Sequence, residues 1–257
     1  KQSTLGPMLS KGDVNGDGDE DFFIGGASGQ AGQLFIWKGE KFTATPQPEL
    51  EKDKGYEDLG SVFFDADGDG DLDLYVVSGS NEFGPDSPML QDRLYLNNGH
   101  GKLSSTPIGT LPSIRSSGSR VVAVDLDQDG DEDLIVGGRA VPQRYPFPDK
   151  SFILINKGGV FQDQTKSWCS QLERIGIVTD LDVADLNADG KLDVVVVGEW
   201  MSPKIFLNIG DKLQESNSTE LDAYKGWWYS CEIADWNGDG TLDILAGNIG
   251  VNHKFSA

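Results

Sequence analysis

The sequence predicts an all-β fold, a β-propeller made of four-stranded blades. An acidic nine-residue pattern, D-x-[DN]-x-D-G-x-x-D, occurs five times in 257 residues, at intervals of 50 to 60 residues. Glycine accounts for 33 residues, while hydrophobic residues make up only 37%, a composition that favours short strands and tight turns over long helices. A repeat of about 50 residues that contains four short strands is typical of a propeller blade.

Each repeat is expected to begin with a strand that leads into the acidic pattern. Runs with β character precede four of the five copies: SVFFDAD, VVAVDLD, DLDVADLN and YSCEIADWN. An apolar run follows every copy and ends at small residues: FFIGGA, LYVVSGS, LIVGGR, VVVVGEW and ILAGNIG. Because these runs are almost unbroken rather than alternating, we expect strands that pack on both faces, between neighbouring blades.

A second pair of strands, arranged around a glycine turn, completes the repeat. The pairs are LFIWKGEKF, RLYLNNGHGKL, FILINKGGVF and IFLNIGDKL. The expected order within a blade is strand A, acidic loop, strand B, connection, strand C, tight turn and strand D. The blades span approximately residues 5–46, 57–107, 118–166, 177–217 and 227–257. The last blade is incomplete, because its strand C would begin only near Asn252.

The acidic loops predict calcium sites. Ca²⁺ takes about six to eight oxygen ligands, and alternate positions of a tight loop can point inward together. Positions 1, 3, 5 and 9 supply side-chain oxygens, whereas position 7, which tolerates Lys and Thr, supplies its backbone carbonyl. Position 6 is always glycine, as a sharp turn at positive φ requires. The predicted ligands of up to five Ca²⁺ ions are Asp13, Asn15, Asp17, Asp19 and Asp21; Asp65, Asp67, Asp69, Asp71 and Asp73; Asp125, Asp127, Asp129, Asp131 and Asp133; Asp185, Asn187, Asp189, Lys191 and Asp193; and Asp235, Asn237, Asp239, Thr241 and Asp243.

Other interpretations of these loops are weaker. Asp and Asn favour turns in any case, but five loops with three or four carboxylates each would repel themselves without a cation. Mg²⁺ is less suited because it demands octahedral geometry, and an EF-hand needs a glutamate at position 12. That position holds only aliphatic residues: Ile24, Val76, Val136, Val196 and Ala246. Loops 2 and 3 have four carboxylates at the ligand positions, so we expect them to bind most tightly.

Charge and cysteine content restrict the partners and the compartment. The formal charge of −21 repels phosphate backbones and anionic lipids, so we expect neither nucleic-acid binding nor direct membrane insertion. Cys169 and Cys231 are interpreted as two small buried residues rather than a bridge or a metal site. Calcium sites of extracellular modules need about 10⁻⁴–10⁻³ M Ca²⁺. We therefore expect a secreted, periplasmic or cell-surface protein.

The repeat resembles the FG-GAP/VCBS repeat, the calcium-loop blade of integrin α-chain propellers and of many bacterial surface proteins. The resemblance covers essentially the whole chain, and the stretches GGRAVPQRYPFP, VVVVGEWM and GWWYS more narrowly resemble bacterial relatives of cartilage acidic protein. It implies a seven-bladed ring, so we expect the five repeats to be a fragment of a larger propeller. It also implies that the acidic loops and the C–D turns share one face, opposite the usual ligand face.

Aromatic residues, arginines and a carboxylate gather in the segments expected on that opposite face. Such residues are common anchors for a protein or carbohydrate ligand. The alternative is that the paired tryptophans wedge between blades as part of the core. The candidate ligand residues are Arg120, Arg139, Arg144, Tyr145, Glu199, Trp200, Trp227 and Trp228.

The sequence favours a calcium-binding extracellular module for adhesion or ligand binding, and not an enzyme. It contains no G-x-S-x-G, phosphate-loop or paired-histidine motif, and neither His100 nor His253 neighbours a plausible nucleophile. One alternative is an accessory or catalytic propeller of a polysaccharide-degrading enzyme, and another is a structural spacer. Fold alone does not decide among them. Glycan binding would favour the first, turnover of an acidic polysaccharide the second, and absence of both the third.

Overall fold

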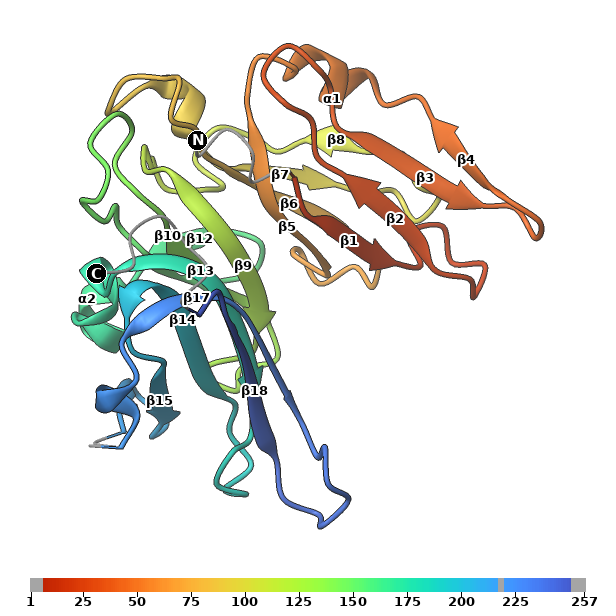
Figure 1. Ribbon diagram of the computed structural model, residues 1–257. Coiled ribbons are helices and arrows are strands. Elements are labelled where there is room, and N and C mark those ends of the chain that lie inside the picture. The colour runs from red at the N-terminus through yellow and green to blue at the C-terminus, as the bar shows by residue number, and fades with distance from the viewer. Residues whose placement is uncertain (1–6, 217–219, 251–257) are drawn as a thin grey trace.

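The computed structural model describes residues 7–216 and 220–250 as a succession of antiparallel sheets (Figure 1). Three sheets have four strands each and the fourth has six, and within each blade the strands are hydrogen-bonded in chain order. The fourth sheet continues into a hairpin through the pairs Glu199–Trp227 and Met201–Gly226. The prediction of an all-β fold made of repeated four-stranded units is confirmed. Strand C of the fifth blade would lie outside the described residues.

The first two blades show how the elements follow one another. Blade 1 contains β1 (Leu9–Gly12), β2 (Asp21–Ile24), β3 (Gln33–Trp37) and β4 (Phe42–Thr45). The short helix α1 (Pro48–Lys52) leads into blade 2. Blade 2 contains β5 (Asp58–Phe64), β6 (Asp73–Ser78), β7 (Arg93–Leu96) and β8 (Ser104–Ser105), with the single-turn helix η2 (Pro88–Leu90) between β6 and β7.

The remaining blades repeat this order. Blade 3 contains β9 (Gly118–Val124), β10 (Asp133–Gly138), β11 (Phe152–Asn156) and β12 (Phe161–Asp163). Helices α2 (Thr165–Cys169) and η3 (Leu172–Arg174) lead into blade 4, which contains β13 (Ile177–Ala184), β14 (Asp193–Met201), β15 (Lys204–Asn208) and β16 (Leu213–Glu215). After η4 (Leu221–Ala223), blade 5 begins with β17 (Gly226–Ala234) and β18 (Asp243–Asn248).

The core lies between neighbouring blades, and strand B contributes to it from both faces. Along β6, Leu74 and Val76 pack toward blade 1, whereas Tyr75 and Val77 pack toward blade 3. Each side chain is fully buried, which stabilises the fold by about 1.5–3 kcal/mol for a large aliphatic residue. In blades 2, 3 and 4 the almost unbroken apolar runs therefore mark strands that are buried on both faces, whereas β2 and β18 expose residues such as Ile24 and Leu245.

The A strands of successive blades contact one another, from β1 and β5 to β13 and β17. Hydroxyl side chains link them: the Ser119 hydroxyl donates to the Val178 carbonyl at 2.7 Å, and the Thr179 hydroxyl donates to the Trp228 carbonyl at 2.8 Å. The approach is close, since a Cβ atom at Gly60 would lie 2.7 Å from the Ser119 carbonyl oxygen. The A strands thus fix the position of each acidic loop relative to the next.

Two further predictions concern burial and membranes. Cys169 and Cys231 are both free and buried, as expected for small core residues. Within residues 7–216 and 220–250, no helix has the length and apolar character needed to cross a membrane.

Candidate functional site

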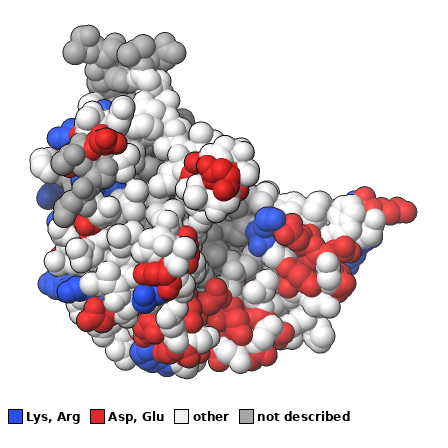
Figure 2. Space-filling view, turned by 90° about the horizontal axis from the view of Figure 1, so that it is seen from below, with Lys and Arg blue, Asp and Glu red and all other residues white. Residues whose placement is uncertain are grey.

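The five acidic loops have one backbone conformation. The glycine at position 6 has φ between 85° and 98° in every loop, a region that residues with a Cβ atom rarely adopt. The aspartate at position 9 is the first residue of strand B in every blade. Figure 2 views the side of the molecule where these loops lie and shows Asp and Glu side chains gathered there.

Backbone N–H groups hold the carboxylates inside each loop. The position-1 carboxylate accepts the N–H of the position-6 glycine at 2.8–3.1 Å in all five loops. The position-5 carboxylate accepts the N–H of position 7 at 2.9–3.0 Å. The donors and acceptors that form the turn therefore also aim several carboxylates at one small volume.

The position-9 aspartates of loops 1 to 4 are buried. Asp73 accepts the Ala66 N–H at 3.0 Å and the Asn97 N–H at 2.7 Å, and Asp133 makes the corresponding bonds in blade 3. Burial raises the pKa of Asp73 to about 6 and that of Asp133 to about 7, although the N–H donors lower both. Burial disfavours the charged form, and a nearby cation would favour it.

Loops 2 and 3 bring three carboxylates together within 4.8 Å: Asp65, Asp67 and Asp73, and Asp125, Asp127 and Asp133. Loops 1, 4 and 5 have an asparagine at position 3 instead. In loop 3 the Oδ1 atom of Asp127 is buried and accepts no hydrogen bond. An orphaned carboxylate oxygen among other carboxylates fits a hard cation that takes oxygen ligands, such as Ca²⁺.

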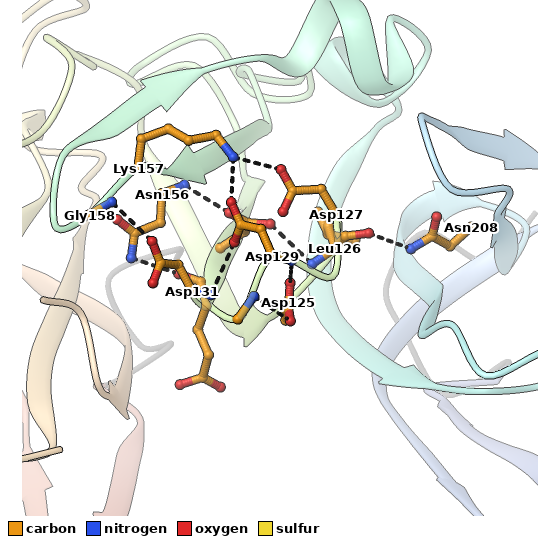
Figure 3. A network of polar contacts seen from close by, with 12 residues as sticks. Asp125, Leu126, Asp127, Asp129, Asp131, Asn156, Lys157, Gly158 and Asn208 are labelled. Atoms are coloured by element: carbon orange, nitrogen blue, oxygen red, sulfur yellow. Dashed lines mark hydrogen bonds and ion pairs between the residues drawn. The ribbon is translucent and has the colours of Figure 1, made fainter. Parts of the chain in front are cut away.

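In loops 2 and 3 the side chain at position 7 points toward the C–D turn of the same blade. The Asp131 carboxylate accepts the Gly158 N–H at 3.0 Å (Figure 3). A Cβ atom at Gly99 would lie 2.5 Å from the Asp71 carboxylate, so the two are in close contact. These positions agree with the interpretation that position 7 would offer only its carbonyl oxygen.

Two contacts at the loops were not anticipated from the sequence. Lys157 of the blade 3 turn places its Nζ atom 2.8 Å from Asp127 and 2.6 Å from Asp129, and these bonds raise the pKa of Lys157 (Figure 3). An asparagine at the end of strand C also reaches the loop of the preceding blade. Asn208 of blade 4, for example, donates to the Leu126 carbonyl of loop 3 at 2.9 Å.

On the opposite face, side chains of three blades meet at Glu199. Arg139 and Tyr145 of blade 3 bind its two carboxylate oxygens at 2.6 and 2.9 Å. The Trp200 indole donates to the Tyr145 hydroxyl at 2.7 Å and packs perpendicular to Trp227 at 4.9 Å. Burial lowers the pKa of Arg139 and raises that of Tyr145 to about 12. We call these five residues the Glu199 cluster.

The other candidate ligand residues lie elsewhere. Arg120 pairs with Asp180 between the innermost strands β9 and β13. Trp228 packs into the core between blades 4 and 5, so the alternative of a wedged tryptophan applies to it. Arg144 is exposed in the turn 141–147. Trp200 is 50% exposed and Tyr145 is 37% exposed, which leaves part of the Glu199 cluster open to a ligand.

The family model of the FG-GAP-like repeat matches residues 13–76, 77–136 and 185–246, which is most of the chain. The chain belongs to the FG-GAP-like repeat family. The matched family is a structural repeat. No curated protein sequence matches the chain.

A solved structure with a TM-score above 0.5 shows the same kind of fold. The structure of BBS1N in complex with ARL6DN, soaked with lead, has a TM-score of 0.51 and 14% identity over 95% of this FG-GAP-like chain and 60% of that chain. The V. cholerae biofilm matrix protein Bap1 has a TM-score of 0.47 and 16% identity over 94% of this chain. This chain spans 34% of the length of Bap1.

Proposed function

We propose that this FG-GAP-like chain is a calcium-binding β-propeller module that acts outside the cytosol, in adhesion or in the binding of a protein or carbohydrate ligand. The observation that carries the proposal is the recurrence of one loop conformation in all five blades, with three carboxylates within 4.8 Å of one another in loops 2 and 3. A module that depends on weak calcium sites suits a compartment rich in calcium.

The proposed ligands are the side-chain oxygens at positions 1, 3, 5 and 9 and the carbonyl at position 7. When bound, Ca²⁺ supplies positive charge among carboxylates that otherwise repel one another. The chain's own contribution is to hold those carboxylates in place through the turn, with glycine at position 6 and, in loops 1 to 4, a buried aspartate at position 9. The orphaned Oδ1 atom of Asp127 supports this assignment.

Loop 2 offers a matched pair of variants for testing these ligands. Asp69→Asn removes a carboxylate that the proposal makes a ligand, whereas Asp71→Asn removes one that lies against Gly99. We expect Asp69→Asn to weaken calcium binding at loop 2 by about tenfold or more, because ligand charge sets affinity. Asp71→Asn should change it little. Isothermal titration of both variants measures this, and equal losses would contradict the ligand assignment.

For ligand binding, the Glu199 cluster is the proposed site. Its buried ion pair fixes the tyrosine and tryptophan side chains, and partly exposed rings held in one orientation are suited to recognition at low entropic cost. The proposal does not distinguish a carbohydrate from a protein surface.

Trp200→Ala tests the Glu199 cluster, with Trp236→Ala as its control. Trp236 is 57% exposed but belongs to acidic loop 5, on the other face. We expect the calcium-loaded protein to bind to glycans or proteins on an array. Trp200→Ala should abolish this binding, whereas Trp236→Ala should leave it unchanged. Equal binding by both variants would place the ligand elsewhere. Turnover of an acidic polysaccharide would instead support the enzymatic alternative.

A further inference from the structure

Three asparagines link the acidic loops of neighbouring blades. Asn97, Asn156 and Asn208 each stand at or directly after the end of strand C, and all are buried. Each side-chain amide donates to the position-2 carbonyl of the preceding loop, at 2.7 Å to Val14, 2.9 Å to Ala66 and 2.9 Å to Leu126. Figure 3 shows the last of these bonds, between Asn208 and Leu126.

The same asparagines are tied to the loop of their own blade. Their backbone N–H groups donate to the position-9 carboxylates Asp73, Asp133 and Asp193 at 2.7–2.8 Å. The other oxygen of each carboxylate accepts the N–H of position 2 in the same loop at 3.0–3.1 Å. Asp21 of loop 1 accepts the Val14 N–H in the same way.

Together these bonds form one chain from loop 1 to loop 4. It runs from Asp21 through Val14 to Asn97 and Asp73, and the same steps recur in blades 3 and 4. The carboxylates and amides in it are at most 6% exposed. Hydrogen bonds in such surroundings are stronger than in water and polarise one another.

We propose that Asn97, Asn156 and Asn208 couple neighbouring loops, so that calcium binding at one loop raises the affinity of the adjacent loops. The inference rests on the proposed calcium binding. Asp73 is a predicted ligand of loop 2 and also holds Asn97, which holds Val14 and through it Asp21 of loop 1. Calcium binding that fixes Asp73 in loop 2 would therefore also order loop 1. Such coupling is reciprocal, and its usual size is about 5- to 150-fold in affinity.

The position-6 glycines give a separate readout for each loop. Their amides bond to the position-1 carboxylates, so ¹⁵N-glycine NMR during a calcium titration follows Gly18 in loop 1 and Gly70 in loop 2. Loop 2 is disabled by Asp67→Ala together with Asp69→Ala. This double variant loses two negative charges and also the two positive charges of the bound Ca²⁺. Loop 2 therefore has the same net charge as the calcium-loaded loop 2 of the unmodified protein.

We expect disabling loop 2 to raise the calcium midpoint of Gly18 about fivefold or more. The rise should vanish when Asn97→Leu is also present. It should persist with Asn98→Leu, because the side-chain oxygen of Asn98 accepts the N–H groups of His100 and Lys102 within its own turn. Asn156→Leu, read at Gly70 with loop 3 disabled, tests the same link one blade further on and replaces Asn97→Leu if that variant does not fold.

Two results would overturn the coupling. An unchanged Gly18 midpoint after loop 2 is disabled would mean that the loops bind independently. An equal rise in the presence of Asn97→Leu would mean that the asparagine is not the link. If neither Gly18 nor Gly70 responds to calcium in the unmodified protein, the proposed calcium binding itself is contradicted.

Discussion

The position-9 aspartates of loops 1 to 4 each serve two purposes at the residue scale. Each is a predicted metal ligand, and each is the acceptor that fixes the turn and the end of strand C. The raised pKa values of Asp73 and Asp133 show that burial disfavours their charged forms. A carboxylate held in such a place gains from a nearby cation, which is a physical reason to expect the loops and the metal to depend on each other.

Lys157 changes the expected ranking of the loops by calcium affinity. The carboxylate count alone makes loops 2 and 3 equal, but the Lys157 ammonium contacts two predicted ligands of loop 3. We therefore predict that Lys157→Gln tightens calcium binding at loop 3 by up to about fivefold, equivalent to about 1 kcal/mol for a partly exposed pair. The calcium midpoint of the Gly130 amide signal in the NMR titration measures the affinity of loop 3. Lys150→Gln is the control because Lys150 pairs with Glu173. A weaker loop 3 in Lys157→Gln would contradict this competition.

At the scale of elements, the connection between β6 and β7 depends on a buried acid. Asp92 accepts the Ser78 N–H and the Tyr75 hydroxyl, each at 2.7 Å. Burial raises the pKa of Asp92 to about 7. Because the folded protein holds this proton more tightly than the unfolded chain does, the contribution of Asp92 to the free energy of unfolding is greatest below about pH 4. It falls as the pH rises to about 7.

Asp92→Asn should remove this part of the pH dependence. We predict that the variant gains stability relative to the unmodified protein between pH 4 and pH 8, by about 1.4 kcal/mol per unit of pKa shift at most. Denaturant unfolding across this range at saturating calcium measures it. Asp86→Asn, at an exposed position of the same connection, is the control. A difference between Asp92→Asn and the unmodified protein that stays constant with pH would contradict the assignment.

Strand order and loop boundaries could be predicted because the same pattern of acidic loop and apolar runs occurs five times in the sequence. Position 9 opens strand B in every blade, as expected. The linking asparagines were overlooked, since an asparagine before a glycine turn is explained well enough by the turn itself. Their recurrence at the third position of YLNNGH, LINKGG and FLNIGD was the available signal.

At the scale of the whole molecule, contacts between blades limit what one sequence can predict. Arg139 and Glu199 are 60 residues apart and meet only because blades 3 and 4 are adjacent. Aromatic content alone did not separate Trp227, which joins the Glu199 cluster, from Trp228, which packs into the core. The seven-bladed ring stays a prediction.

The central claim is that calcium stabilises the whole FG-GAP-like domain. Each loop joins the two innermost strands of its blade, and one site at 100 times its Kd adds about 2.7 kcal/mol to the free energy of unfolding. Thermal unfolding in excess calcium and in excess chelator, with magnesium as the control, measures this most directly. We predict a single transition whose Tm falls by about 10 °C or more in chelator, since 1 kcal/mol corresponds to about 2–4 °C at this size. An unchanged Tm would contradict the account.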